Sequence, residues 1–142
     1  MLQDLEQPAL FEYKVTAGSL DKLFENAGIS LMNVIIDTHH ILRKVEHKIT
    51  LMAPSKESLM SAWLTELIRR LDDEHLLIGE MLVEIIEHDR QDLRLEATVC
   101  GENFDIHRHR LRAYVQAVGP ETPKITFDSD TEEWTAQVSV EV

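Results

Sequence analysis

The stretch SLDKLFENAGISLMNVIID, residues 19–37, decides how the chain folds, because it carries a sustained helical pattern. Ser19 stands where an N-cap is expected, since its hydroxyl can accept a hydrogen bond from a free amide of the first turn. Gly28 would weaken the helix by about 1 kcal/mol relative to alanine, so close packing is expected to explain it. The apolar residues recur at spacings of three and four, which predicts one core-facing helix surface: Leu20, Leu23, Phe24, Ala27, Leu31 and Val34.

Strand patterns flank this helix, and a second helix follows. Residues 11–17 are aromatic and β-branched, which predicts a strand. Residues 45–52 alternate between apolar and polar side chains and predict another. Ser55 or Ser58 then caps a helix with one broad apolar stripe: Leu59, Met60, Trp63, Leu64, Leu67, Ile68 and Leu71.

The remainder of the chain predicts five strands. Residues 76–86 form an apolar run, and a polar turn at His88, Asp89 and Arg90 leads into Leu93, Leu95, Ala97 and Val99, which share one face. These two segments predict an antiparallel hairpin. Three further strands are expected over residues 111–118, 123–127 and 133–142.

The last predicted strand separates its side chains into two faces. Trp134, Ala136, Val138, Val140 and Val142 alternate with Thr135, Gln137, Ser139 and Glu141, and the second set is expected to face water or a partner. The order β, α, β, α and five strands predicts an α+β fold. Its two helices should pack on a mixed, largely antiparallel sheet.

Composition restricts the classes of function. The 142 residues include 44% hydrophobic residues, which is enough for a single domain over residues 1–142. The net charge of −12 disfavours direct nucleic-acid binding, because such a surface repels phosphates, and it suits a basic protein partner. No apolar run is long enough to cross a bilayer, and the amino terminus lacks a secretory signal. A cytoplasmic protein is expected.

The common catalytic motifs are absent from the sequence. There is no glycine-rich phosphate loop, no nucleophile elbow and no His-Glu-x-x-His pair. Cys100 is the single cysteine, which excludes an internal disulfide, and its place at a strand end indicates a small strand residue rather than a nucleophile. Trp63 is expected in the core, and Glu66 is expected to be a solvated charge rather than a general base.

Two histidine groups remain as alternatives for a metal site. Asp37, His39 and His40 lie together at a helix end, where a polar helix terminus is the favoured interpretation. His107 and His109 would point the same way on a strand and could then hold a transition metal. Their sequence is more typical of a loop in which basic residues are solvated or paired with acids such as Asp105.

Four segments in colinear order resemble the archease family. They are SLDKLFENAGISLMNVIID (19–37), ESLMSAWLTELIRRLDDEHLL (57–77), GENFDIHRHRLRAYVQAV (101–118) and EWTAQVSVEV (133–142). The third is similar to the family's Gly-Glu-x-Phe-Asp-x-x-x-His segment. The second matches a Trp-Leu-x-Glu-Leu core.

The resemblance implies an accessory protein rather than an enzyme. Archeases promote the guanylylation and turnover of RtcB-type RNA ligases in tRNA splicing and RNA repair. The family also binds a Ca²⁺-like divalent cation through an aspartate near the amino terminus and the last two residues, which correspond here to Glu141 and Val142. Oxygen ligands suit such an ion. Glu141 can equally be an exposed charge on an outer strand.

The chain departs from the family at two functional positions. The amino-terminal aspartate falls on Leu10, so a metal ligand is absent unless Asp4 or Glu6 replaces it after a local shift. A lysine proposed to take part in the family's activity becomes Gln116. The alternative is therefore a diverged scaffold that serves as a protein-binding or chaperone-like module without a metal or ligase-activating role. A small hydrolase using the histidines is the weakest hypothesis.

Overall fold

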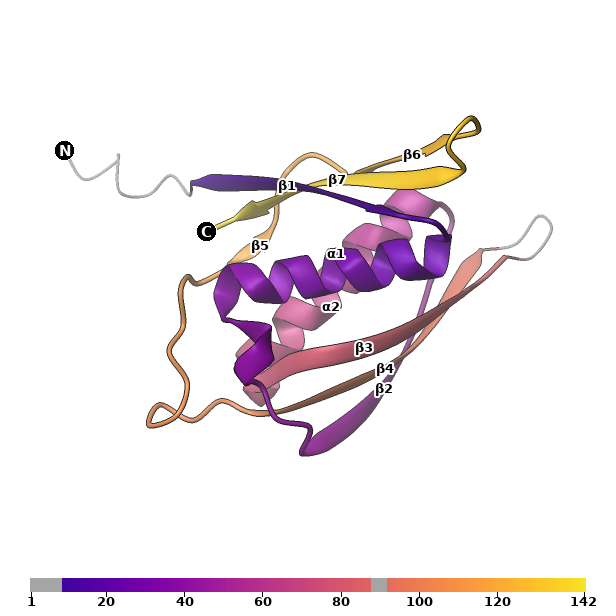
Figure 1. The fold of residues 1–142 in the computed structure, drawn as a ribbon. Helices are drawn as coiled ribbons and strands as arrows, with labels where there is room; N and C mark the ends of the chain where they lie inside the picture. The colour runs from indigo at the N-terminus through magenta and orange to yellow at the C-terminus, as the bar shows by residue number, and fades with distance from the viewer. Residues whose placement is uncertain (1–8, 88–91) are drawn as a thin grey trace.

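The part of the chain that the structure describes contains two α-helices, a 3-10 helix and seven strands (Figure 1). The computed structural model describes residues 9–87 and 92–142. The elements are β1 (Leu10–Ala17), α1 (Leu20–Ile35), the 3-10 helix η2 (Thr38–His40), β2 (Val45–Ala53), α2 (Lys56–Glu74), β3 (Leu76–Ile86), β4 (Leu93–Asn103), β5 (Ala117–Val118), β6 (Lys124–Asp128) and β7 (Glu133–Glu141). The predicted order of helices and strands is confirmed. The predicted turn at His88, Asp89 and Arg90 lies outside the described residues.

The strands form two sheets with both helices between them (Figure 1). One sheet has the order β1-β7-β5, with β6 also paired to β7, and the other has the order β2-β4-β3. All pairings among the described strands are antiparallel. The α+β class is confirmed, but the expected one sheet is divided in two. Helix α1 contacts both β1 and β3, so its broad apolar surface is covered on two sides.

The predicted strand over residues 111–118 is wrong except at its end, because only β5 pairs. Ala117 lies opposite Glu141, the last residue of β7, and Lys124 of β6 lies opposite Gln137 on the same edge. A strand continued back from Ala117 towards residue 111 would extend past the end of β7 and find no backbone partners. The segment forms a loop instead.

Local signals fixed both helix starts. The Ser19 hydroxyl accepts from the Lys22 amide at 3.2 Å, which confirms the predicted N-cap. At α2, Ser55 is the cap and Ser58 completes a capping box with it. Gly28 also behaves as expected, because a Cβ there would lie 2.5 Å from the sulfur of Met81 on β3.

Helix α1 also covers the open edge of β3. Glu25 is buried and accepts a hydrogen bond from the Val83 amide at 2.9 Å, and Asp21 accepts from the Ile85 amide at 2.9 Å. Two carboxylates of the helix thus satisfy backbone donors that an edge strand would otherwise present to another chain.

The outward and inward faces of β7 are those predicted. Ala136, Val138 and Val140 are buried in the core between the first sheet and the helices, whereas Gln137 is exposed. Next to it, Tyr13 of β1 points inward and donates from its hydroxyl to the Ala27 carbonyl of α1 at 3.0 Å. Burial raises the pKa of Tyr13.

Candidate functional site

The predicted functional positions meet at the carboxyl end of β7. Glu141 lies opposite Leu10 of β1 on one side and Ala117 of β5 on the other. The Gln116 amide donates to the Glu141 carbonyl at 2.8 Å, and the Val142 amide donates to the Ala9 carbonyl at 2.9 Å. Sequence segments more than 100 residues apart therefore converge where the resemblance places the family's site.

The donors gathered there do not fit a Ca²⁺ site of the family's pattern. Ca²⁺ takes six to eight oxygen ligands, with carboxylates foremost. Leu10, which is 53% exposed, presents an aliphatic side chain opposite Glu141, and Asp4 and Glu6 lie outside the described residues. Among the residues that the structure describes, no three His, Cys, Asp or Glu side chains gather as a metal group. The assignment of Glu141 and Val142 as ligands stays a prediction.

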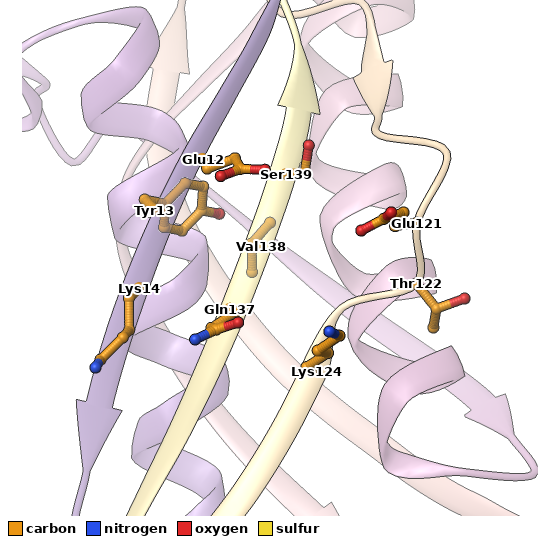
Figure 2. Close-up of a pocket in the computed structure, with 9 residues that line it drawn as sticks. All are labelled: Glu12, Tyr13, Lys14, Glu121, Thr122, Lys124, Gln137, Val138 and Ser139. Atoms are coloured by element: carbon orange, nitrogen blue, oxygen red, sulfur yellow. The ribbon is translucent and has the colours of Figure 1, made fainter.

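A polar hollow of about 330 Å³ continues from this position along the outer face of β1 and β7 (Figure 2). Glu12 lies opposite Ser139, and Gln137 lies between Lys14 and Lys124. Charges of both signs therefore line its floor. The segment before β6 contributes Glu121 and Thr122.

A second polar cluster surrounds Glu102 at the end of β4. This carboxylate is only 2% exposed and accepts from the Leu42 amide at 2.7 Å and from both terminal nitrogens of Arg108. Nε2 of His109 lies 3.1 Å from Oε2 of Glu102, and the Nζ of Lys44 lies 3.9 Å from Oε1. The hydrogen bonds from Arg108, followed by that from Leu42, lower the pKa of Glu102 to about 2. The side chain is therefore an ionised anchor at neutral pH.

The tautomer of His109 follows from its neighbours. Its Nδ1 accepts from the Asp105 amide at 2.9 Å, so the proton of the neutral ring is on Nε2 and faces Glu102. The Phe104 ring stacks on the imidazole with centroids 5.9 Å apart. A tight turn results, in which the Arg108 and His109 amides donate to the Asp105 carbonyl.

This cluster decides between the two interpretations of the His107 and His109 pair. The loop interpretation is confirmed, because His109 is buried against Glu102 whereas His107 is exposed. The two rings do not share a site, and the predicted pairing with Asp105 occurs through its backbone amide rather than its carboxylate. Sequence reasoning missed Glu102. The available signal was an acidic residue in an otherwise apolar strand end, six positions before Arg108.

The polar helix terminus predicted for Asp37, His39 and His40 is confirmed. Asp37 caps η2 by accepting from the His39 amide at 3.0 Å, and this hydrogen bond lowers the pKa of Asp37. The rings of His39 and His40 lie 3.0 and 4.0 Å from its carboxylate. Arg112 lies 3.8 Å away and also donates to the Asn33 carbonyl at the end of α1. These contacts stabilise the polar segment that follows the end of α1.

The other singled-out residues have structural roles. Trp63 is fully buried, as predicted, and its Nε1 donates to the Phe24 carbonyl at 2.9 Å. Cys100 lies on β4, also as predicted, and it is buried. Glu66 is not simply solvated, because it pairs with Arg69 and Arg70, both at 2.7 Å. The Arg69 hydrogen bond lowers the pKa of Glu66, which does not favour a general base.

Comparison with known proteins identifies relatives across the whole chain. The Archease protein family matches residues 3–142. Protein archease of Methanosarcina barkeri is 29% identical over 138 residues, which cover 97% of this chain and 93% of the relative. Protein archease of Pyrococcus furiosus is 32% identical over 120 residues, with coverages of 84% and 83%.

A solved structure has a similar fold. The solution structure of Methanobacterium thermoautotrophicum protein 1598 matches with a TM-score of 0.79 at 23% identity, covering 96% of this chain and 94% of that one. In addition, no helix within residues 9–87 and 92–142 is long and apolar enough to span a membrane.

Proposed function

The chain belongs to the archease family, and from this premise we propose that it is a non-catalytic, cytoplasmic accessory protein of an RtcB-type RNA ligase. In this role it promotes guanylylation of the ligase, and so its repeated turnover, in tRNA splicing or RNA repair. The observation that carries the proposal is the family match over residues 3–142. The proposed activity, promotion of ligase guanylylation, follows from the sequence resemblance to archeases.

The charge of the chain is consistent with action through the ligase protein. A net charge of −12 repels the phosphates of RNA and attracts a basic protein surface. The contact that the proposal requires is therefore between two proteins, with the RNA held by the ligase alone.

A ligation assay tests this function directly. Purified ligase from the same organism is supplied with RNA ends and a guanylate donor, with and without this protein, and both ligated product and guanylylated ligase are measured. We expect multiple turnovers and more guanylylated ligase when the protein is present. Unchanged turnover would refute the proposal.

Calorimetric titration of Ca²⁺, Mg²⁺ and Mn²⁺ into metal-free protein tests the cation separately. If Glu141 and Val142 hold a cation, Glu141→Gln abolishes the binding heat. Because Leu10 supplies no oxygen, we expect Leu10→Asp to tighten Ca²⁺ binding by at least about tenfold, since added ligand charge strengthens such sites. Equal Ca²⁺ affinities for the natural chain and the Leu10→Asp variant would show that Leu10 does not occupy a ligand position.

A second candidate function is a protein-binding or chaperone-like module without metal or ligase-activating roles. The exposed Leu10 opposite Glu141 favours it, because an apolar residue there replaces the family's carboxylate. Under this alternative, the natural chain does not stimulate the ligase, whereas a variant carrying Leu10→Asp and Gln116→Lys gains stimulation. Stimulation by the natural chain removes the alternative.

A further inference from the structure

The outer edge of β1 presents unpaired backbone groups. The Ala9 carbonyl accepts from the Val142 amide, so the odd-numbered residues of β1 exchange hydrogen bonds with β7. The backbone groups of Leu10, Glu12, Lys14 and Thr16 then point to the opposite, open edge. Asn26 confirms this direction, because its side chain donates to the Thr16 carbonyl at 2.9 Å. It makes the one hydrogen bond to this edge among the described residues.

Apart from the charges of Glu12 and Lys14, this edge lacks the features that usually prevent strand pairing. β1 is eight residues long, contains no proline and keeps an unbroken register with β7. Phe11 is 44% exposed and Leu10 also remains exposed, so apolar surface accompanies the free backbone groups. The contrast with β3 is clear, since two carboxylates of α1 cover the edge of that strand.

We propose that β1 pairs with β1 of a second copy of the chain, in an antiparallel arrangement about a twofold axis at Tyr13. In this register Glu12 lies opposite Lys14 of the second copy, and Lys14 lies opposite Glu12 of the second copy. Both side chains are exposed on the outer face of the strand, so the Glu12–Lys14 ion pair forms twice, once on each side of the axis. The two sheets become one continuous sheet.

Charge complementarity selects this register from its neighbours. Only the even-numbered residues of β1 direct backbone groups outward, so an even-numbered residue must pair with an even-numbered residue of the second copy. The possible registers therefore have the twofold axis at successive residues of β1. An axis at Glu12 places the two glutamates opposite each other, and an axis at Lys14 places the two lysines opposite each other. With the axis at Phe11 or Val15, Glu12 and Lys14 no longer lie opposite each other across the interface.

The inner face of the same register covers the exposed aromatic residue. Phe11 lies beside Val15 of the second copy, in a position where side chains are close because the pair is not hydrogen-bonded. On the outer face, Leu10 lies opposite Thr16, whose carbonyl oxygen retains a second lone pair beside its bond to Asn26. The arrangement therefore satisfies edge groups and reduces apolar exposure together.

Sedimentation equilibrium of the whole chain tests this interface, over concentrations from about 1 μM to about 1 mM, the range of weak to moderate affinities. The mass should rise from 16.3 kDa towards twice that value. Glu12→Lys and Lys14→Glu should each weaken the dimer at least about tenfold, because each creates two like-charge pairs. The double exchange Glu12→Lys with Lys14→Glu should restore it. Mixing the two single variants should give a heterodimer.

Controls separate the interface from general effects of charge. Glu46→Lys makes the same change at an exposed position of β2 in the other sheet and should leave the dimer intact. Circular dichroism should show that every variant is folded.

A monomer at all concentrations overturns the proposal. This outcome includes the case in which the edge of β1 binds only an extended segment of a different protein. A dimer that ignores both single variants, or is not restored by the double exchange, also overturns it. The measurement needs no ligase, so its outcome is independent of the proposed function.

Discussion

Replacing Glu102 with glutamine keeps the size of the side chain and removes the charge that organises its cluster. The carboxylate accepts from the Leu42 amide and from Arg108, and it lies 3.1 Å from Nε2 of His109. A glutamine offers one oxygen acceptor, and its NH₂ group must face donors of Leu42, Arg108 or His109. At least one donor in the cluster is then left without an acceptor.

The cost follows from burial of the contacts. Hydrogen bonds to charged groups contribute about 1.5 to 3 kcal/mol each, and breaking a fully buried pair costs about 3 to 5 kcal/mol. Glu102 and His109 are buried, but Arg108 is partly exposed and regains water. We therefore expect Glu102→Gln to lower the free energy of unfolding by about 2 to 4 kcal/mol. At about 2.1 cal/mol/K per residue, the melting temperature falls by about 6 to 13 °C.

This loss should depend on pH in a defined direction. The pKa of Glu102 falls from its ordinary value of 4.5 to about 2 in the folded protein, so the charged form stabilises the fold. That stabilisation is complete above the unfolded pKa and disappears as the pH falls through the folded pKa. The stability difference between the natural chain and Glu102→Gln should be constant above about pH 5 and shrink from about pH 4.5 to about pH 2.

Urea unfolding measured at a series of pH values checks both statements. Glu80→Gln is the matched control, because Glu80 pairs with Arg43 at 2.8 Å in the same sheet but is well exposed. Exposed pairs contribute about 0 to 1 kcal/mol, so this control should change stability little. A Glu102→Gln variant as stable as the control, or a difference that persists unchanged at pH 2, would refute the reasoning.

Two further stability predictions use neighbouring elements. A Cβ at Gly101 would lie 1.7 Å from the Leu77 carbonyl oxygen, so Gly101→Ala should lower the free energy of unfolding by at least about 3 kcal/mol, measured by calorimetry. A Cβ at Gly18 would have no atom within 4 Å, so Gly18→Ala should leave the stability nearly unchanged. Equal melting temperatures for these two variants would contradict the packing. Glu25→Ala should cost about 1 to 3 kcal/mol because the Val83 amide loses its acceptor, and Lys22→Ala, which removes only the exposed partner of Glu25, should cost less than about 1 kcal/mol. A larger loss for Lys22→Ala would show that the ion pair within α1 contributes more to stability than the hydrogen bond from the Val83 amide to Glu25.

The helices and most strands were predictable because their signals are local. Ser19 and Ser55 cap helices by contacts within three residues, and the alternation along β7 directly gives its buried face. The strand expected over residues 111–118 failed for a nonlocal reason. Its pattern suits a strand, but β7 ends at Glu141 and β6 occupies the edge further along, so no partner remains.

The Glu102 cluster shows why a site formed by distant segments is not predicted from local sequence patterns. Alternation along β4 puts Glu102 on the side opposite Leu95, Ala97 and Val99, where exposure is expected. The loop that follows β4 returns over it, and the Leu42 amide arrives from a segment 60 positions earlier. The one local signal, an acidic residue six positions before Arg108, does not indicate either event. By contrast, the positions that the resemblance predicts as a site do lie together at the end of β7, because a family resemblance carries information on distant segments at once.

We expect the two regions to separate the stability of the fold from the proposed activity. Residues 101–109, within the third segment that resembles the family, are occupied by packing and by the buried ion pair, whereas the departures at Leu10 and Gln116 lie beside Glu141 at the exposed end of β7. Leu10→Asp replaces an exposed side chain, so it should change stability by less than about 1 kcal/mol while changing Ca²⁺ affinity. Glu102→Gln should do the reverse, with a lowered melting temperature and an unchanged cation titration below it. If both variants change both properties, the end of β7 and the Glu102 cluster are energetically coupled, and the division of roles inferred from their positions is wrong.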